Sequence, residues 1–494
     1  MRDYMNKLSK NSIEIIEKIK KDTGNSPDII IKTVPFLGTY IHVVFGETVT
    51  DRTTINEFIL EFFEKKENDS KSETDVIKYL KTKIPAQKIT KISKYDEFLY
   101  NIFSGFTVIL VDGSDEALAI ECRTKLDSGV MPAQAETIIK GPKDAFTENY
   151  QTNIGLIRKR IKSEKLWLEE HIVGKRSKTK VGILYIEDIV DKKIVKYISD
   201  KIKKIDIDSI MDSNYIIELI SGNYRNVFSD YLSTERPDIV NMHLLNGKIA
   251  IIVENTQYVV IVPIVFFDFF HTSEDFYQKV INVNYTRIVR LLAFFITILT
   301  PAIYIAITTH NHEAIPEKLL ISFSAQRDGV PFPSIVEALL MLITFEILKE
   351  TDLRIPNMLG SALSIVGALV LGEAAVQAGI VSPIMVIVIA ITAISGLIVS
   401  SVELSNGIRW WRIIYIIGAA SLGLIGVLLV SLVLVINITS IKSFGLPFFS
   451  PVAPLNFSNQ NNAIFLTNKR KFMQRDSLTA KRNKKRSAGS DENA

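Results

Sequence analysis

The sequence of 494 residues contains a single cysteine, Cys122. One cysteine excludes a disulfide within the chain and any metal cluster that needs several thiolates. A small buried hydrophobic side chain in a strand is the ordinary role of such a residue, and we expect it for Cys122. Redox chemistry by paired thiols of this chain is therefore excluded.

Signatures of catalysis are also absent. The sequence has no Gly-x-x-x-x-Gly-Lys-Ser/Thr phosphate loop, no Gly-x-Ser-x-Gly nucleophile elbow and no His-Glu-x-x-His zinc helix. The six histidines are scattered, and His310 and His312 lie just after an apolar segment. A solvated loop is the favoured interpretation of that pair, ahead of a metal site. We expect a protein that is not an enzyme and that holds no cofactor and no metal.

A signal peptide is not expected either, because the first 20 residues are charged and amphipathic rather than apolar. Apolar residues are nevertheless abundant, at 47% of the chain with a mean hydropathy of +0.20. They are concentrated after residue 285, whereas the preceding part is rich in Lys, Glu, Ile and Asp. The sequence therefore predicts a membrane protein with a large soluble region, whose insertion depends on the later segments.

The soluble region is predicted to be α/β, with two subdomains at residues 1–127 and 128–286. In the first, the dipeptide Asp112-Gly113 between two β-branched runs predicts a hairpin over residues 106–122. The other elements expected there are strands at 29–31 and 40–45 and a helix at 53–66. In the second we expect helices at 149–160, 192–204 and 207–221, a strand at 180–187 and a hairpin at 248–263.

The membrane domain is predicted to cover residues 287–440. Five apolar segments occur there, at 288–309 (broken at Pro301), 334–348, 359–380, 383–402 and 413–438. Five crossings would place the two ends of the chain on opposite sides of the membrane, whereas we expect both in the cytoplasm. We therefore predict four spans and one short helix that does not cross, at 334–348, since 15 residues reach only about 22 Å through a core of about 30 Å.

The tail, residues 441–494, is basic and is expected to be disordered after residue 457. Nine Lys and Arg residues lie between Lys469 and Arg486, against the single acid Asp476. No aromatic platform or recognition fold accompanies them, so nucleic-acid binding is disfavoured. A cytoplasmic tail near anionic membrane lipid is the favoured interpretation.

Three glutamates, Glu337, Glu346 and Glu373, lie within the apolar segments. An ionised carboxylate at the centre of a bilayer costs about 2 to 3 kcal/mol on insertion scales. We therefore propose these residues as a candidate cation pathway. A fourth, Glu403, lies at a helix end, where an interfacial position is expected.

Small residues form a stripe in the same region. Gly360, Ser364, Ala368 and Gly372 recur at four-residue spacing, and Gly379 continues a neighbouring stripe. This pattern predicts a close helix-packing interface, either within one subunit or between subunits.

A charged turn precedes a predicted helix at residues 234–238, Thr-Glu-Arg-Pro-Asp. A salt-bridged structural turn is favoured there over a contact with a ligand.

Eight stretches of the chain carry a family resemblance: GPKDAFTENYQTNIGLIRKRIK, VGKRSKTKVGILYI, STERPDIV, SEDFY, TPAIYIAI, PFPSIVEALLMLITFEILKETDLRIP, SIVGALVLGEAAVQAGIVSP and FGLPFFSPVAPLN. In this order they resemble the GerA family of spore germination proteins, in particular the A-type subunit of nutrient germinant receptors. The tail after residue 456 departs from that pattern.

The resemblance implies a multipass protein of the spore inner membrane that acts with B-type and C-type partner subunits. It also implies a homo-oligomer that releases monovalent cations in response to nutrients. The alternatives are a non-conducting membrane scaffold and a germination amplifier of the same family. A secondary transporter is less favoured, because the sequence shows no inverted pair of matching halves.

Overall fold

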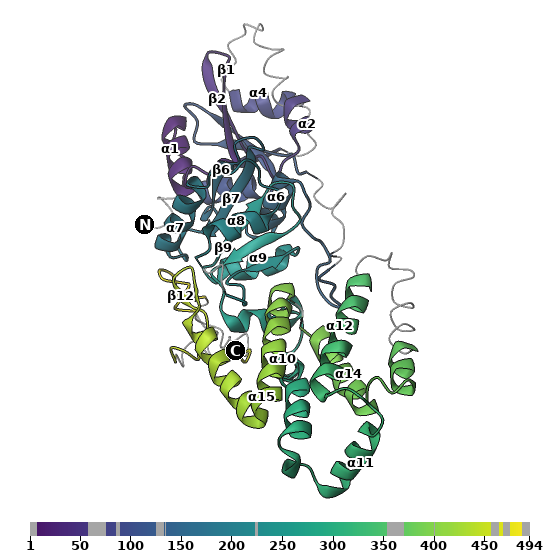
Figure 1. Ribbon diagram of the computed structural model, residues 1–494. Helices are drawn as coiled ribbons and strands as arrows, with labels where there is room; N and C mark the ends of the chain where they lie inside the picture. Colours follow the sequence, from purple (N-terminus) through teal and green to yellow (C-terminus); the bar gives the residue numbers. More distant parts are fainter. Residues whose placement is uncertain are drawn as a thin grey trace.

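The computed structural model describes residues 7–57, 76–84, 89–124, 133, 135–222, 226–352, 370–399, 401–455, 464–467 and 475–486. Figure 1 shows an α/β region, purple to teal, next to a group of helices, green to yellow-green. The segment after the last long helix lies beside the α/β region rather than beyond the helices. The structure thus has an N-terminal α/β region followed by a helical part, as the predicted fold class requires.

The first subdomain is built on a sheet of strand order β1-β2-β4-β5-β3, in which all neighbours are antiparallel. The predicted hairpin at 106–122 is confirmed, since Phe106 pairs with Glu121 and Gly113 takes a φ of 86° in the turn. Two separate hydrophobic cores lie on the two faces of the sheet. The elements are α1 (Ser12–Asp22), β1 (Ile29–Phe36), β2 (Thr39–Gly46), α2 (Arg52–Ile55), α4 (Val76–Lys83), β3 (Ile89–Ile92), α5 (Tyr95–Phe103), β4 (Phe106–Val111) and β5 (Ala117–Glu121).

The helix predicted at 53–66 falls largely outside the described residues, which include α2 at its start. Cys122 is buried, as expected, directly after β5.

The second subdomain has a sheet of order β6-β7-β9-β10-β8, again with antiparallel neighbours. Strand β6 was not predicted, and α8 is shorter than the helix expected at 207–221 because Ile207 and Asp208 instead pair with the turn at Lys175 and Arg176. The elements are α6 (Tyr150–Arg160), β6 (Leu166–Val173), β7 (Thr179–Ile186), α7 (Lys192–Lys203), α8 (Ser213–Ile220), β8 (Leu232–Thr234), α9 (Pro237–Leu245), β9 (Ile249–Val253) and β10 (Val259–Val262).

One hydrophobic core runs from the second subdomain into the helices. It contains residues of α6 and α9, the Phe-rich turn η3 (Phe266–Phe270) and residues of the helical part such as Phe294 and Trp411. Phe266 lies at the centre of an aromatic group. Its ring centroid is 5.5 Å from that of Phe294 and 6.1 Å from that of Phe448. The second subdomain and the helices therefore share their apolar interior.

Helix α10 (Val280–Thr309) continues through Pro301, so the break predicted there is not found. Proline removes one backbone donor, which membrane helices tolerate when their neighbours are packed closely. The helix also begins eight residues before the predicted segment, because Arg287 and Arg290 pair with Asp275 in η4 (Ser273–Phe276). This first part of α10 belongs to the junction with the soluble region.

Among the described residues, four further α-helical segments lie between α10 and residue 400. They are α11 (Glu317–Arg327), α12 (Ser334–Asp352), residues 370–377, and α14 (Pro383–Leu397). Helix α12 has 19 residues instead of the 15 predicted, a length of about 28 Å.

Helix α15 (Val402–Ser440) is two helices that meet at Gly423, whose φ of 65° and ψ of −142° are not helical. Around this turn Gly418 contacts Gly426, and the turn packs on the end of α10, where His310 Nε2 lies 2.8 Å from the carbonyl oxygen of Ala420. The continuous helix predicted at 413–438 is therefore divided, and its second half folds back toward the soluble region.

By length and composition, α10 and α15 are the described helices that could cross a membrane, and α14 is a shorter apolar helix.

The segment after α15 packs on the second subdomain. It forms the small hairpin β11 (Lys442–Ser443) and β12 (Leu446–Pro447), and Phe448 is fully buried. Further on, Thr479 Oγ1 donates to the carbonyl of Asn246, and Ala480 is fully buried. Residues 475–486 are thus docked on the domain, which differs from the disordered tail that the composition predicted.

Candidate functional site

The glutamates predicted on the short helix lie on opposite faces of α12, since nine residues make two and a half turns. Glu337 is buried with 1% of its surface exposed. Its Oε2 accepts the backbone N–H of Ser382 at 2.9 Å, and its Oε1 lies 3.7 Å from Arg327 Nε. Glu337 therefore ties α11, α12 and the start of α14 together.

Glu346 faces the first half of α15. Its two carboxylate oxygens lie 3.2 Å from Arg409 Nη2 and 3.2 Å from Arg412 Nη2. Two cavities flank this group, one of about 520 Å³ and one of about 30 Å³, and both are lined by Glu346 together with Lys349, Arg409 and Arg412. The site is a charged cluster between helices, with the cations in excess.

Glu373 is exposed, and its Oε1 accepts a hydrogen bond from Gln377 Nε2 at 3.2 Å. Within one chain the three predicted glutamates thus lie in three different places.

The predicted small-residue stripe is described only at its end. Gly372 is buried against Val386, and Gly379 has a φ of 67° beside the carbonyl oxygen of Gly329. Gly360, Ser364 and Ala368 lie outside the described residues.

Glu403, at the start of α15, joins the helices to the second sheet. Its carboxylate accepts the hydroxyl of Ser233 and, at 3.2 Å, the backbone N–H of the same residue in β8. Only 7% of Glu403 is exposed. Sequence patterns do not indicate this contact, because the two residues are 170 positions apart.

The charged turn at residues 234–238 is structural, as expected. Arg236 Nη2 lies 2.8 Å from Asp238 Oδ2, and it also donates to the carbonyl of Pro142. Glu235 Oε1 accepts the backbone N–H groups of Ala135 and Glu136, each at 2.7 Å. These bonds hold the linker between the subdomains against the turn that follows β8.

Burial is the main cause that raises the pKa of Glu136 to about 7. The negative charges of Glu235 and Glu403 add to this effect, and the hydrogen bond from Thr234 and the charge of Arg236 oppose it. Three carboxylates therefore approach each other where the linker, β8 and α15 meet. Among the described residues no group of three or more His, Cys, Asp or Glu side chains could hold a metal ion.

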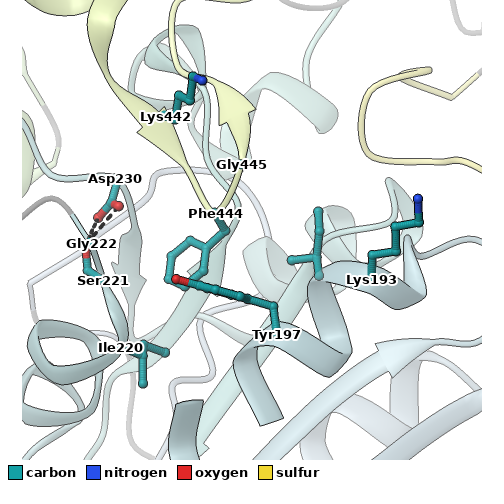
Figure 2. Close-up of a pocket in the computed structure, with 10 residues that line it drawn as sticks. Lys193, Tyr197, Ile220, Ser221, Gly222, Asp230, Lys442, Phe444 and Gly445 are labelled. Carbon is teal, nitrogen blue, oxygen red and sulfur yellow. Dashed lines mark hydrogen bonds between the residues drawn. The ribbon is translucent and has the colours of Figure 1, made fainter. Parts of the chain in front are cut away.

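A third cavity, of about 370 Å³, lies where the segment after α15 docks on the soluble region (Figure 2). Phe444 enters it from the β11–β12 turn and meets Tyr197 of α7 edge to face, with ring centroids 6.4 Å apart. Asp230 lies on the opposite side, where its carboxylate accepts the hydroxyl of Ser221 at 3.0 Å. Ser443 beside it donates to the backbone carbonyl of Asp230.

Polar contacts connect the soluble region to the ends of the membrane-domain helices and could transmit movement between them. The soluble region holds the start of α10 through Asp275, the start of α15 through Ser233, and the segment after α15 through Asp230. A displacement of the second subdomain would be carried into the helix ends at these contacts.

Comparison with known proteins matches residues 17–478 to the family described as "Bacillus/Clostridium GerA spore germination protein". The chain is similar to spore germination protein KA of Bacillus subtilis, with 38% identity over 93% of this chain and 84% of that protein. It is also similar to spore germination protein A1 of the same organism, with 31% identity over 94% of each. GerLA of Bacillus cereus is 33% identical over 90% of this chain and 91% of that protein.

Among solved structures, the crystal structure of the N-terminal domain of the A subunit of the Bacillus megaterium germinant receptor GerK3 is 30% identical. It covers 53% of this chain and 97% of that chain, with a TM-score of 0.42.

Proposed function

The chain belongs to the GerA family of spore germination proteins, and on that premise we propose that it is the A-type subunit of a germinant receptor complex. Receptor subunits of this family are not enzymes. The proposed role is to help sense nutrients with B-type and C-type partner subunits, and to release monovalent cations through an oligomeric path in the spore inner membrane.

The arrangement of the helices supports the proposal that both ends of the chain lie on the same side of the membrane. One end of the bundle faces the soluble region, through Arg287 of α10 and Glu403 of α15. At the other end, the hydroxyl oxygen of Thr308 in α10 lies 3.4 Å from that of Ser334 in α12. Asn311 Oδ1 accepts a hydrogen bond from the backbone N–H of Leu424. Because α15 turns back at Gly423, the chain leaves the bundle on the side where it entered.

This fold-back changes the topology that we propose. The sequence alone required residues 334–348 not to cross, in order to keep both ends in the cytoplasm. With the turn at Gly423, both ends lie on one side even if residues 334–348 do cross. Helix α12 begins at Ser334, beside the far end of α10, and reaches Glu346, beside Arg409. We therefore include α12 and both halves of α15 among the segments that run between the two ends.

The observation that carries the proposal of a cation path is a contrast between two exposed faces. The second half of α15 exposes large apolar residues such as Leu428 and Leu432, which suit lipid. Residues 370–378 also expose Val370 and Leu371, but beside them lie the exposed residues Glu373, Ala374, Gln377 and Ala378. A carboxylate on such a face is costly in lipid, so we assign this face to water or to another copy of the chain.

In this proposal Glu373 faces the path, while Glu337 and Glu346 hold helices in position through Ser382 and the two arginines. Nutrient binding within the complex would bias the soluble region, and the contacts at Asp275, Ser233 and Asp230 would shift the helix ends between closed and open populations.

The test is cation flux from vesicles that contain the full chain assembled with its B-type and C-type partners. Glu373→Gln should lower nutrient-triggered flux several-fold, because it removes a charge that attracts cations into the path. Glu313→Gln, which changes an exposed glutamate in the loop after α10, should leave it unchanged. Equal flux from both variants would remove Glu373 from the path.

The alternative function is a non-conducting scaffold or a germination amplifier of the same family. It is favoured by the pairing of two of the three predicted glutamates with arginines inside one chain. Nutrient-responsive complexes that form fully but give no flux above protein-free vesicles would support it.

A further inference from the structure

A groove between α12 and the first half of α15 has a basic end and an apolar wall. We propose that it binds an anionic phospholipid from the leaflet nearest the soluble region, with the phosphate at Lys349, Arg409 and Arg412. The site lies outside the exposed face of residues 370–378 and goes beyond the receptor function proposed above.

The basic end offers donors that the protein does not use. Arg412 has 8% of its side chain exposed, yet among the described residues its Nε has no hydrogen-bond partner. Arg409 and Arg412 share the single carboxylate of Glu346 through their Nη2 atoms, and the side chain of Arg409 is 42% exposed. Lys349 lines the same cavity, so that three cations face the two carboxylates of Glu346 and Glu350 there. Guanidinium groups arranged in this way suit a phosphate, which accepts several charge-assisted hydrogen bonds.

Apolar side chains form the remaining wall of the groove. It is lined by Leu339, Leu342, Ile343, Ile347 and Ile413. Leu339 precedes Glu346 by seven residues of helix, so this wall extends for about 10 Å from the charged end. Ile343 and Ile347 are 60% and 61% exposed, which leaves the groove open to the side where lipid tails would lie. A free anion would use the basic end only, whereas a phospholipid uses both.

The position of Arg409 and Arg412 along α15 suits the level of lipid headgroups in the membrane. Arg409 and Arg412 follow Glu403 by six and nine residues, or about 9 and 14 Å along the helix. Glu403 itself contacts Ser233 in the soluble region. Trp410 between them is 61% exposed, as is usual for tryptophan at the boundary between headgroups and tails. Basic pockets between helices at this level are established binding sites for acidic headgroups.

Native mass spectrometry of the full chain in detergent, with equal amounts of phosphatidylglycerol and phosphatidylcholine, tests the site. Wild-type protein should retain phosphatidylglycerol preferentially. Lys349→Gln and Arg409→Gln should each lower that retention about fivefold, since each removes one basic contact. Lys318→Gln on the exposed surface of α11 is the matched control and should leave retention unchanged.

Results of three kinds would overturn the proposal. The first is equal retention of the two lipids by wild-type protein, or unchanged phosphatidylglycerol retention in a folded Lys349→Gln/Arg409→Gln double variant. The second is full displacement of phosphatidylglycerol by inorganic phosphate, which would indicate an anion site without a lipid tail. The third is a disulfide-linked dimer formed by Ile347→Cys in a Cys122→Ser background, which would place a second copy of the chain on the wall.

Discussion

The hydroxyl oxygens of Tyr415 and Ser431 lie 2.9 Å apart, although the residues are 16 positions apart in one helical segment. In a straight helix they would be separated by about 24 Å. The contact therefore requires the chain to reverse at Gly423, and it joins the two halves of α15 on either side of that turn.

Replacement of Gly423 by alanine should destabilise the bundle. Its φ of 65° is unfavourable for a residue with a side chain, and an added Cβ would overlap Asn311 Oδ1 and lie 2.7 Å from His310 Cβ. We expect a loss of about 1 to 3 kcal/mol in the free energy of unfolding. Thermal unfolding in detergent measures it. Gly396→Ala is the control, because its added Cβ would meet Thr297 at an ordinary 3.5 Å. Equal losses in the two variants would contradict the reversal.

The two subdomains are joined by a buried ion pair, Arg158 with Asp28, in which Arg158 Nη2 lies 2.9 Å from Asp28 Oδ1. Asp28→Asn should lower the free energy of unfolding by about 3 to 5 kcal/mol, because it leaves a fully buried arginine without its charge partner. Chemical denaturation of the purified chain measures this change.

The matched control for that pair is exposed. Asp206→Asn breaks the contact with Lys175, in which the side chains are 69% and 70% exposed, and should cost less than about 1 kcal/mol. A similar small loss in Asp28→Asn would show that the buried pair does not hold the subdomains together.

The raised pKa of Glu136 should make the free energy of unfolding depend on pH. The folded protein retains its proton up to about pH 7, whereas the unfolded chain releases it near 4.5. The stabilisation is therefore complete below about pH 4.5 and is lost as the pH rises through 7. Glu136→Gln cannot ionise, so its stability relative to wild type should rise by about 1 to 3 kcal/mol between pH 4 and pH 8. Thermal unfolding across this range would refute the assignment if the difference stayed constant.

The contact between Glu403 and Ser233 should couple the helices to the second sheet. Glu403→Ala, Ser233→Ala and the double variant form a cycle, and we expect a coupling free energy of about 1 to 3 kcal/mol in unfolding. Glu403→Ala should also reduce nutrient-triggered flux more than Glu317→Ala, which changes an exposed residue of α11. A coupling near zero would mean that the two parts communicate elsewhere.

Local signals in the sequence were sufficient for several elements. Asp112-Gly113 gave the hairpin because its turn geometry is encoded by two adjacent residues. Helix α6 begins where expected, since Asn149 accepts the backbone N–H of Thr152 as its cap. Helix α7 likewise follows from its apolar face and from Asp191 at its start.

Contacts between distant residues could not be predicted in this way. Gly423 resembles the other glycines of an apolar run, and its turn is set by packing on His310 and Asn311. Strand β6 lies at the edge of its sheet and carries Glu169 and Glu170 in succession, which obscures the alternation expected for a strand. The carboxylates of the helices were identified as unusual, but their partners are 45 and 66 positions away at Ser382 and Arg412.

The apolar core shared by the second subdomain and the helices limits where the protein can bend. Phe266, Phe294 and Phe448 form one aromatic group across that boundary, so rotation there would open a cavity in a packed interior. The first subdomain has cores of its own. A stimulus on the first subdomain would therefore reach the second through the Arg158–Asp28 pair, and the second subdomain and the bundle would respond together.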